Sequence, residues 1–454
     1  MYEPQDTYFY FIVFLSLFYT FYKIGLNKLS ILIVLVFWSG LFGYIGTSLH
    51  NYYKIILVGY ALALFYKKIP VVYNKHDQYV NLFFILFSIS FWTSYTLQGG
   101  GIVTILSQYL YKYGFVFILY HGFKDIVFNE SKRVYLKKAL IQVLLVQVAL
   151  SVFKILIFGF DIERNVGSME YGSGAFAVVI PIAGLFLYWV GKHGRLTQKD
   201  WIIVGSFFII AIASGKRSPV IMFPLFTFLL LAYVSSKANP LRFFKYIPFV
   251  LVFLYFGARL TPTLNPERQV WGSFDFSHIV DYSLRYNFGT TEIDAIIQGN
   301  YIATGRGGSL FLLSQPERLG FNDPQDFLFG HGLYHVAVRE GGRFTGSGEY
   351  YLDHQGLVGE AIRLFYSLGL FGLLFIFLMG WVLIKTIKNK KLRYVILIYF
   401  IWDFFMYYNH FVFANASATL VVFTCFYANT VDLTKKNKLF SFQNHKKFEH
   451  PISS

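Results

Sequence analysis

Long apolar runs separated by short polar stretches recur along almost the whole chain. Each run is close to the length of about 20 residues that a helix needs to cross a bilayer. Such segments are expected to be helical, because lipid cannot satisfy unpaired backbone groups. Thirteen spans are predicted, at 8–25, 29–47, 53–67, 78–98, 102–121, 138–159, 174–191, 201–214, 218–235, 244–259, 363–384, 393–410 and 415–431.

One polar segment, 260–362, is far longer than the others. Apolar positions recur with helical spacing over 276–287 and 291–301, while 305–308 and 341–348 are glycine-rich and predict turns. Structureless loops of this length are uncommon, which favours a small folded unit. The predicted fold class is an all-α polytopic membrane protein with about thirteen transmembrane helices, in a range of 11 to 14, and one large extracytoplasmic loop folded as a mainly helical cap.

Composition supports this class. Of 454 residues, 56% are hydrophobic and only 14% are charged, whereas soluble domains are about 25% charged. These values exclude a soluble enzyme and a disordered chain. The single Cys425 excludes a disulfide framework and a thiolate metal site. No internal repeat is apparent, which weighs against transporters built from duplicated halves.

Charges predict the orientation. One set of alternate loops carries 26 of the 40 basic residues and 6 of the 24 acids. The opposite set carries 12 basic residues and 17 acids. The basic side is expected to be cytoplasmic. The N-terminus is then outside, the C-terminus is cytoplasmic, and the first run is a retained span and not a cleaved signal. The net charge of +16 therefore reflects insertion and not a nucleic-acid partner. Three ionisable residues fall within predicted spans, namely Lys112, Lys154 and Asp403.

This topology divides the chain into four parts. They are 1–259 with ten spans, 260–362 as the large outer loop, 363–431 with three spans, and 432–454 as a basic cytoplasmic tail.

The two faces differ in the kind of cation they carry. The cytoplasmic loops hold 22 Lys and 4 Arg, and the outer face holds 10 Arg and 2 Lys. From Arg259 to Arg363 there are eight Arg and no Lys. Insertion requires only charge, whereas forked recognition of phosphate oxygens favours guanidinium. The alternative is that these arginines pair with the outer acids as ordinary surface residues.

Three motifs are more specific. In the first, Ser214-Gly215-Lys216-Arg217-Ser218-Pro219, serine suits a helix cap and proline the first helical position. Arg217 is thus expected at the N-terminal end of a transmembrane helix, where free N–H groups attract anions. The alternative is an arginine that anchors the helix end at the membrane boundary.

The second motif is Thr304-Gly305-Arg306-Gly307-Gly308, later followed by Phe329-Gly330-His331-Gly332. Glycine around Arg306 permits close approach of a ligand to the backbone, although such turns are also ordinary in loops. His331 and His335 are expected to be structural turn residues.

The third motif is Tyr351-Leu352-Asp353-His354-Gln355-Gly356, leading to Glu360 and Arg363. His354 is expected just outside the membrane at a helix start, where the helix dipole favours a neutral ring that can accept a proton. Asp353 or Glu360 would orient that ring. The alternative is a solvated or capping histidine.

Protease, hydrolase and ATPase motifs are absent, since the sequence has no HExxH, GxSxG elbow or Walker loop. The arrangement instead resembles the O-antigen ligase/polymerase superfamily, and within it the polymerase (Wzy-like) branch, over about residues 160–375. The matching motifs are Arg164-Asn165-Val166-Gly167, Ser214-Gly215-Lys216-Arg217-Ser218, Gly305-Arg306 with Phe329-Gly330-His331-Gly332, and His354-Gln355 before Gly369-Leu370-Phe371-Gly372. In the family the histidine is usually followed by Asn, where this chain has Gln355.

The resemblance implies transfer of a glycan from undecaprenyl diphosphate to an acceptor hydroxyl at the outer face, with no cofactor or metal. It implies that Arg217 and Arg306 hold the diphosphate and that His354 is the base. The expected substrate-binding residues around them are Arg164, Arg339, Arg343, Arg363, Glu360 and Asp353.

The predicted function is that of a polysaccharide polymerase acting on undecaprenyl-diphosphate-linked oligosaccharides in the bilayer. A chain-length regulator and a flippase are possible partners. The alternatives are a ligase that moves finished glycans to another acceptor, or a lipid or polysaccharide transporter. A transporter would be expected to use charged groups within its spans, for which Lys112, Lys154 and Asp403 are the candidates.

Overall fold

The computed structural model describes most of the apolar runs and the two ends of the large loop. The described residues are 4–45, 47–69, 71, 74–98, 102, 106, 109–159, 167–169, 174–213, 217–234, 244, 247–288, 309–314, 316–332, 339–340, 343–344, 359–406 and 415–431.

Most of the described residues in the first half of the chain are helical. Its elements are α1 (Pro4–Ile24), α2 (Lys28–Phe37), α3 (Ser39–Ile45), α4 (Thr47–Phe65), the 3₁₀ turn η1 (Tyr66–Lys68), α5 (Lys75–Gln98), the π-helical η2 (Tyr109–Gly114), α7 (Phe115–Phe128), α8 (Glu130–Phe158), α9 (Gly174–Gly191), α10 (Gln198–Ala213), α11 (Arg217–Phe228) and the π-helical η3 (Leu229–Val234).

The second half adds the described parts of the large loop. Its elements are α13 (Ile247–Leu260), η4 (Pro262–Leu264), α14 (Phe276–Phe288), η5 (Ser309–Ser314), η6 (Pro316–Leu319), α17 (Pro324–Phe329), the strands β1 (Arg339–Glu340) and β2 (Arg343–Phe344), α19 (Glu360–Lys385), α20 (Lys390–Met406) and α22 (Asn415–Tyr427).

Every predicted span coincides with one or two of these helices. Five are long and apolar enough to cross a membrane, as expected of a membrane protein: Asp6–Ile24, Lys75–Leu97, Glu130–Phe158, Arg217–Val234 and Glu360–Lys385. That the other eight also cross stays a prediction. The helix expected over 276–287 is confirmed as α14, whereas 291–301 lies outside the described residues.

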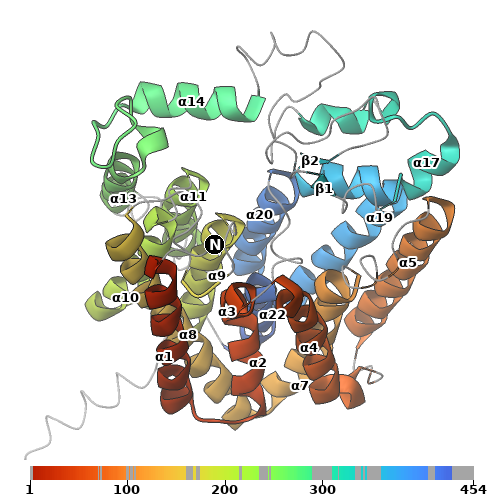
Figure 1. Cartoon of the computed structure of the whole chain (residues 1–454), viewed down its shortest axis with the longest axis horizontal. Helices are drawn as coiled ribbons and strands as arrows, with labels where there is room; N and C mark the ends of the chain where they lie inside the picture. The colour runs from red at the N-terminus through yellow and green to blue at the C-terminus, as the bar shows by residue number, and fades with distance from the viewer. Residues whose placement is uncertain are drawn as a thin grey trace, which may run out of the picture.

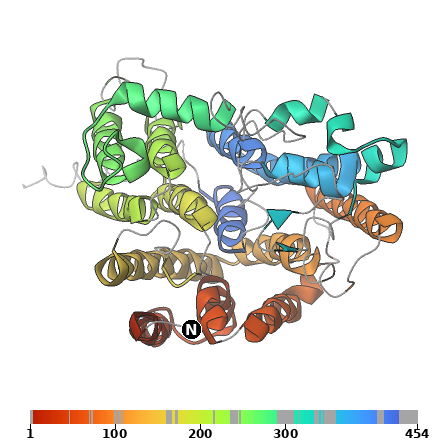
Figure 2. The same cartoon turned by 45° about the horizontal axis from the view of Figure 1, so that its top comes forward.

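The helices pack in rows around a buried centre (Figures 1 and 2). Figure 2 shows α1, α2 and α4 in one row, with α8 and α7 against it. α1 and α2 contact α8, and α4 contacts α7. α22 lies at the centre, contacts α7 and α9, and has all its residues buried. On one side α9 contacts α11, which contacts α13, and on the other α19 packs along α5 and α20.

The run 29–47 was expected to form one helix, and this is wrong. The structure breaks it at Trp38 between α2 and α3. A buried turn at Gly167-Ser168 fills the break: Ser168 Oγ donates to the Phe37 carbonyl at 2.7 Å, and the Gly40 N–H donates to the Ser168 carbonyl at 3.1 Å. The interrupted backbone is thus satisfied by protein groups, which is how non-helical segments are tolerated at membrane depth.

The same turn is tied to α8 by buried polar side chains. Gln147 Oε1 accepts the Ser168 N–H at 2.7 Å, and Ser151 Oγ accepts the Gly167 N–H at 2.9 Å. Gly167 has a φ of +52°, and a Cβ on it would meet the Gln147 side chain. The end of the Arg164–Gly167 motif is therefore a structural turn, and its glycine is required by that close contact.

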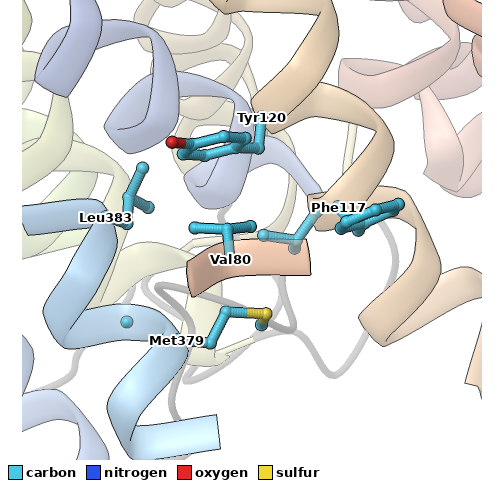
Figure 3. A pocket seen from close by; sticks show the side chains of 7 residues that line it. Val80, Phe117, Tyr120, Met379 and Leu383 are labelled. Atoms are coloured by element: carbon cyan, nitrogen blue, oxygen red, sulfur yellow. The ribbon is translucent and has the colours of Figure 1, made fainter. Parts of the chain in front are cut away.

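Between α5, α7 and α19 the packing leaves an apolar void of about 10 Å³ (Figure 3). Val80, Tyr120 and Met379 are among its walls. A cavity needs about 10–15 Å³ of this kind to hold one water molecule, so the void has room for one water at most and is too small for a ligand. At one edge Tyr120 donates to Asp77 at 3.0 Å, and Asp77 also forms a buried 3.0 Å ion pair with Lys124.

Helix α19 is interrupted at Gly369, which has φ 64° and ψ −166°. The interruption leaves carbonyls of α19 available to the loop. The His331 N–H donates to the Tyr366 carbonyl at 2.8 Å, and the Gly332 N–H donates to the Ser367 carbonyl at 2.9 Å. The Gly330–Gly332 backbone thus fastens the end of the described loop segment 316–332 to α19.

Candidate functional site

Arg217 lies where the motif predicted, at the N-terminal end of a membrane helix. It is the first residue of α11, which starts two residues earlier than the expected Pro219. Proline is tolerated in the first turn because the N–H groups there have no intrahelical partner. The guanidinium lies 4.3 Å from the ring centroid of Tyr282 on α14. Arg217 therefore sits between the membrane helices and the loop helix α14.

Glu360 and Arg363 share the first turn of α19, after the N-cap Gly359. Arg363 Nη1 lies 3.8 Å from Glu360 Oε2, and Glu360 is only 8% exposed. An acidic side chain in the first turn is stabilised by the helix dipole. The sequence predicted Arg363 as the first residue of a span and Glu360 in the loop before it, whereas the helix begins at Glu360 and includes both.

The sequence did not predict the neighbours of this pair. Lys112 lies on η2, and the charges of Glu360, Arg363 and Lys54 all act on its ammonium group. Buried Tyr113 is likewise acted on by the charges of Glu360 and Arg363. π-Helical turns are frequent at functional sites. A lysine within an apolar run was the available signal, but the sequence offered no partner for it.

Lys54 belongs to the same charged group, here called the cation cluster: Lys54, Lys112, Glu360 and Arg363. Lys54 lies on α4, with its ammonium group 5.6 Å from the centroid of the Tyr111 ring. α4 contacts η2 directly. The cluster thus joins three segments that are far apart in sequence, and its four side chains carry a formal charge of +2.

Arg217 belongs to a different group of helices from this cluster. α11 packs with α9 and α13, while α19 packs with α5 and α20. In Figure 1 α11 and α13 lie on one side of α22, and α19 and α5 lie on the other. The described residues therefore show two candidate cationic sites: Arg217 beside α14, and the cation cluster around η2.

The structure describes only some of the remaining predicted site residues. Arg339 and Arg343 lie on β1 and β2, where Glu340 pairs with Arg343 and Arg339 with Phe344 in antiparallel register. Four predicted site residues lie outside the described residues: Arg164, Arg306, Asp353 and His354.

His331, expected to be structural, has structural contacts. Its Nε2 lies 3.0 Å from the Leu319 carbonyl oxygen, and its ring stacks on Phe321 with centroids 4.7 Å apart. Phe321 in turn packs against Phe365 of α19. The histidine therefore helps to hold the described loop segment on the helix that carries the cation cluster.

Among the described residues, no group of three or more His, Cys, Asp or Glu side chains is placed to hold a metal ion. No family model matches the chain, and no curated protein matches it.

Proposed function

We propose that this protein is a polysaccharide polymerase of the O-antigen, capsule or exopolysaccharide type. It would join undecaprenyl-diphosphate-linked oligosaccharide repeat units at the outer face of the bacterial inner membrane. The observation that carries the proposal is Arg217, a guanidinium at the N-terminus of a membrane helix that contacts Tyr282 of the loop helix α14. A helix N-terminus and a guanidinium both favour phosphate oxygens.

The proposed reaction is a substitution at the anomeric carbon of the donor. The acceptor hydroxyl oxygen forms a bond to that carbon, the bond from carbon to the diphosphate oxygen breaks, and the diphosphate leaves with the electron pair. Arg217 and Arg306 stabilise its charge, at about 1.5–3 kcal/mol for each charged hydrogen bond. His354 accepts the hydroxyl proton.

Two rival functions have the same membrane location. A ligase would use the same chemistry with a different acceptor. A transporter is favoured by one observation: Lys154 and Asp403 are buried within helices, with Lys154 acted on by the charge of Asp6 and lying over the Phe9 ring. Buried charges inside a membrane mark transport paths in many proteins.

Purified protein in liposomes distinguishes the three functions. Supplied with one undecaprenyl-diphosphate-linked oligosaccharide, the protein is expected to give a ladder of lipid-linked products that grow by whole repeat units. Transfer only to an added second acceptor would indicate a ligase. Movement of the lipid-linked oligosaccharide between leaflets without any extension would indicate a transporter.

Replacing Arg217 by lysine is expected to slow polymerisation about 10- to 150-fold, because the forked contact with the phosphate is lost while the charge remains. Arg217→Ala is expected to have the larger effect. The rates are measured from ladder formation at equal amounts of folded protein.

Arg259→Lys is the matched control. Arg259 also lies over an aromatic ring, that of Trp271 at 4.5 Å, but its Nε donates to the Gly272 carbonyl at 2.8 Å and serves the fold. Full activity of Arg217→Lys, or an equal loss in both lysine variants, would contradict the assignment of Arg217 to the diphosphate.

A further inference from the structure

α14 carries an exposed apolar stripe, although it belongs to the large loop. At about 100° per residue, Phe276, Val280 and Leu284 fall on one side of the helix. Their side chains are 66%, 41% and 55% exposed. These three residues are here called the α14 stripe. Contiguous exposed apolar surface is typical of a site that meets a membrane or another protein.

The other two sides of α14 have different surroundings. On one, Ile279 packs against the main apolar core, and the ring of Tyr282 lies 4.3 Å from the Arg217 guanidinium. On the other, Ser277 and Asp281 are exposed. The α14 stripe thus lies between a side that meets the protein and a side that is polar. A helix that lies in the plane of a membrane surface, at the edge of a protein, has protein, lipid and water on its three sides.

The exposed face of α13 leads toward this helix. α13 packs along α11, the first part of the helix Arg217–Val234, which is long and apolar enough to cross a membrane. Beside such a helix an exposed apolar face meets hydrocarbon. On α13 this face is formed by Leu251, Val252, Tyr255 and Phe256. In Figures 1 and 2 α14 lies across the ends of α11 and α13 and does not continue their direction.

The turn between α13 and α14 extends this face with aromatic rings. Trp271 packs on Phe256 with ring centroids 6.0 Å apart, and Phe274 packs on Tyr255 at 5.5 Å. Trp271 has φ 68°, which is rare for a bulky residue, and is 50% exposed. The Arg259 guanidinium lies 4.5 Å from the centroid of the Trp271 ring. Exposed aromatic rings and an arginine at a helix end are typical of the boundary between hydrocarbon and water.

We propose that α14 is an interfacial helix, which lies in the membrane surface at the end of α13. The α14 stripe is immersed in the acyl boundary, to a depth of about 5–10 Å. Ser277 and Asp281 face water. The rings of Trp271 and Phe274 join the stripe to the exposed face of α13, so the partner of the stripe is the lipid that already covers that face.

This surface binds lipid by apolar contact and not by charge. Residues 259–284 hold two arginines and three acids, a formal charge of −1. Attraction to anionic lipid requires clusters of basic residues. We therefore expect equal immersion of α14 in bilayers of phosphatidylethanolamine alone and in bilayers with added phosphatidylglycerol. Immersion does not require the reaction proposed above, but it holds Arg217, which Tyr282 contacts, near the level of the lipid head groups.

Nitroxide labels on α14 test its depth. Cys425 is buried, so a thiol-reactive nitroxide labels an introduced cysteine selectively. Val280→Cys and Leu284→Cys place the label on the stripe, and Ser277→Cys is the matched control on the polar side. In liposomes the collision rate with oxygen is divided by that with a water-soluble nickel chelate. This ratio is expected to be about tenfold higher at both stripe positions than at Ser277.

Two results would overturn the proposal. Equal ratios at the three positions would mean that α14 lies in water. Low collision rates with both oxygen and the chelate at Val280 and Leu284 would mean that protein, such as a second copy of this chain, covers the stripe. A high ratio found only in liposomes with phosphatidylglycerol would overturn the apolar basis of binding.

A carboxylate on the stripe provides a second test. In the protein labelled at Leu284→Cys, Val280→Glu is expected to lower the ratio to the value at Ser277, because a charge is costly in hydrocarbon. Ser277→Glu adds the same charge on the polar side and is expected to leave the ratio unchanged. An unchanged ratio in both variants, or an equal fall in both, would contradict immersion of the stripe.

Discussion

Replacing His354 by alanine is expected to lower the polymerisation rate about 100- to 10,000-fold, the usual contribution of a general base. The acceptor hydroxyl must lose its proton as it attacks the anomeric carbon, and no other group in the proposed reaction accepts that proton. Ladder formation is measured with saturating substrate. Because imidazole can accept the same proton as the lost side chain, added imidazole is expected to restore part of the rate.

His331→Ala provides the contrast. His331 contacts the Leu319 carbonyl and the Phe321 ring, so its replacement is expected to lower thermal stability while activity per folded molecule is largely kept. Rescue by imidazole is not expected, since no proton transfer is lost. If His354→Ala kept its activity, or His331→Ala were the variant rescued by imidazole, the proposed base would be wrong.

The positions of the helices could be predicted because each reflects a local requirement of the membrane. The ends were less predictable. α8 was expected from residue 138 but begins at Glu130, where Asn129 caps it by accepting the Lys132 N–H at 3.1 Å. Its first turns are charged, and hydropathy does not recognise such turns as helix. A polar capping residue was the local signal that the apolar pattern did not include.

The break at Trp38 could not be predicted, because it depends on contacts between distant residues. The run 29–47 is mostly apolar, and its Ser39-Gly40 pair directly after Trp38 is a turn signal. Glycine is also frequent within transmembrane helices, so the pair does not by itself require a break. The Phe37 carbonyl at the break accepts a hydrogen bond from Ser168, which is more than a hundred residues away along the chain. A single sequence without such pairing information favours the unbroken helix.

Some residues of the candidate site could likewise be predicted from local sequence signals, and others could not. Arg217 was predicted near a helix start because Ser218 and Pro219 mark one in the sequence. Arg363 was predicted as the first residue of a span and Glu360 as a loop residue before it, and both lie in the first turn of α19. Lys54 and Lys112 were not assigned to the site, because Glu360, whose charge acts on Lys112, lies about 250 residues after Lys112 along the chain. A lysine in an apolar run indicates that a partner or ligand exists, but only the fold shows which one.

The contact between Gly330 and Gly369 is expected to be the most sensitive point of the fold near the site. A Cβ on Gly369 would lie 2.3 Å from the Leu328 carbonyl carbon, and one on Gly330 would lie 2.5 Å from the Gly369 nitrogen. Both obstacles are backbone and cannot rotate away. Gly330→Ala or Gly369→Ala must therefore separate the loop from α19, together with the bonds from His331 and Gly332 to that helix.

Gly159→Ala separates the two expected causes of destabilisation in Gly369→Ala, which are backbone strain and overpacking. Gly159 has φ 73° and ψ −167°, close to the values of Gly330 and Gly369, but a Cβ on it would meet no atom within 4 Å. Its alanine variant thus has only the backbone strain, about 1–3 kcal/mol. Gly369→Ala is expected to be less stable than Gly159→Ala by about 2 kcal/mol or more, because overpacking is added.

Thermal unfolding in detergent measures the stability of both variants. Their polymerisation rates show whether activity depends on the contact between Gly330 and Gly369. Gly369→Ala is expected to lose activity even below its unfolding temperature, because α19 positions Glu360 and Arg363 and the loop leads toward His354. Gly159→Ala is expected to keep its activity. Equal stability of the two variants would mean that the loop does not rest on α19, and an active Gly369→Ala protein would mean that the site does not depend on that contact.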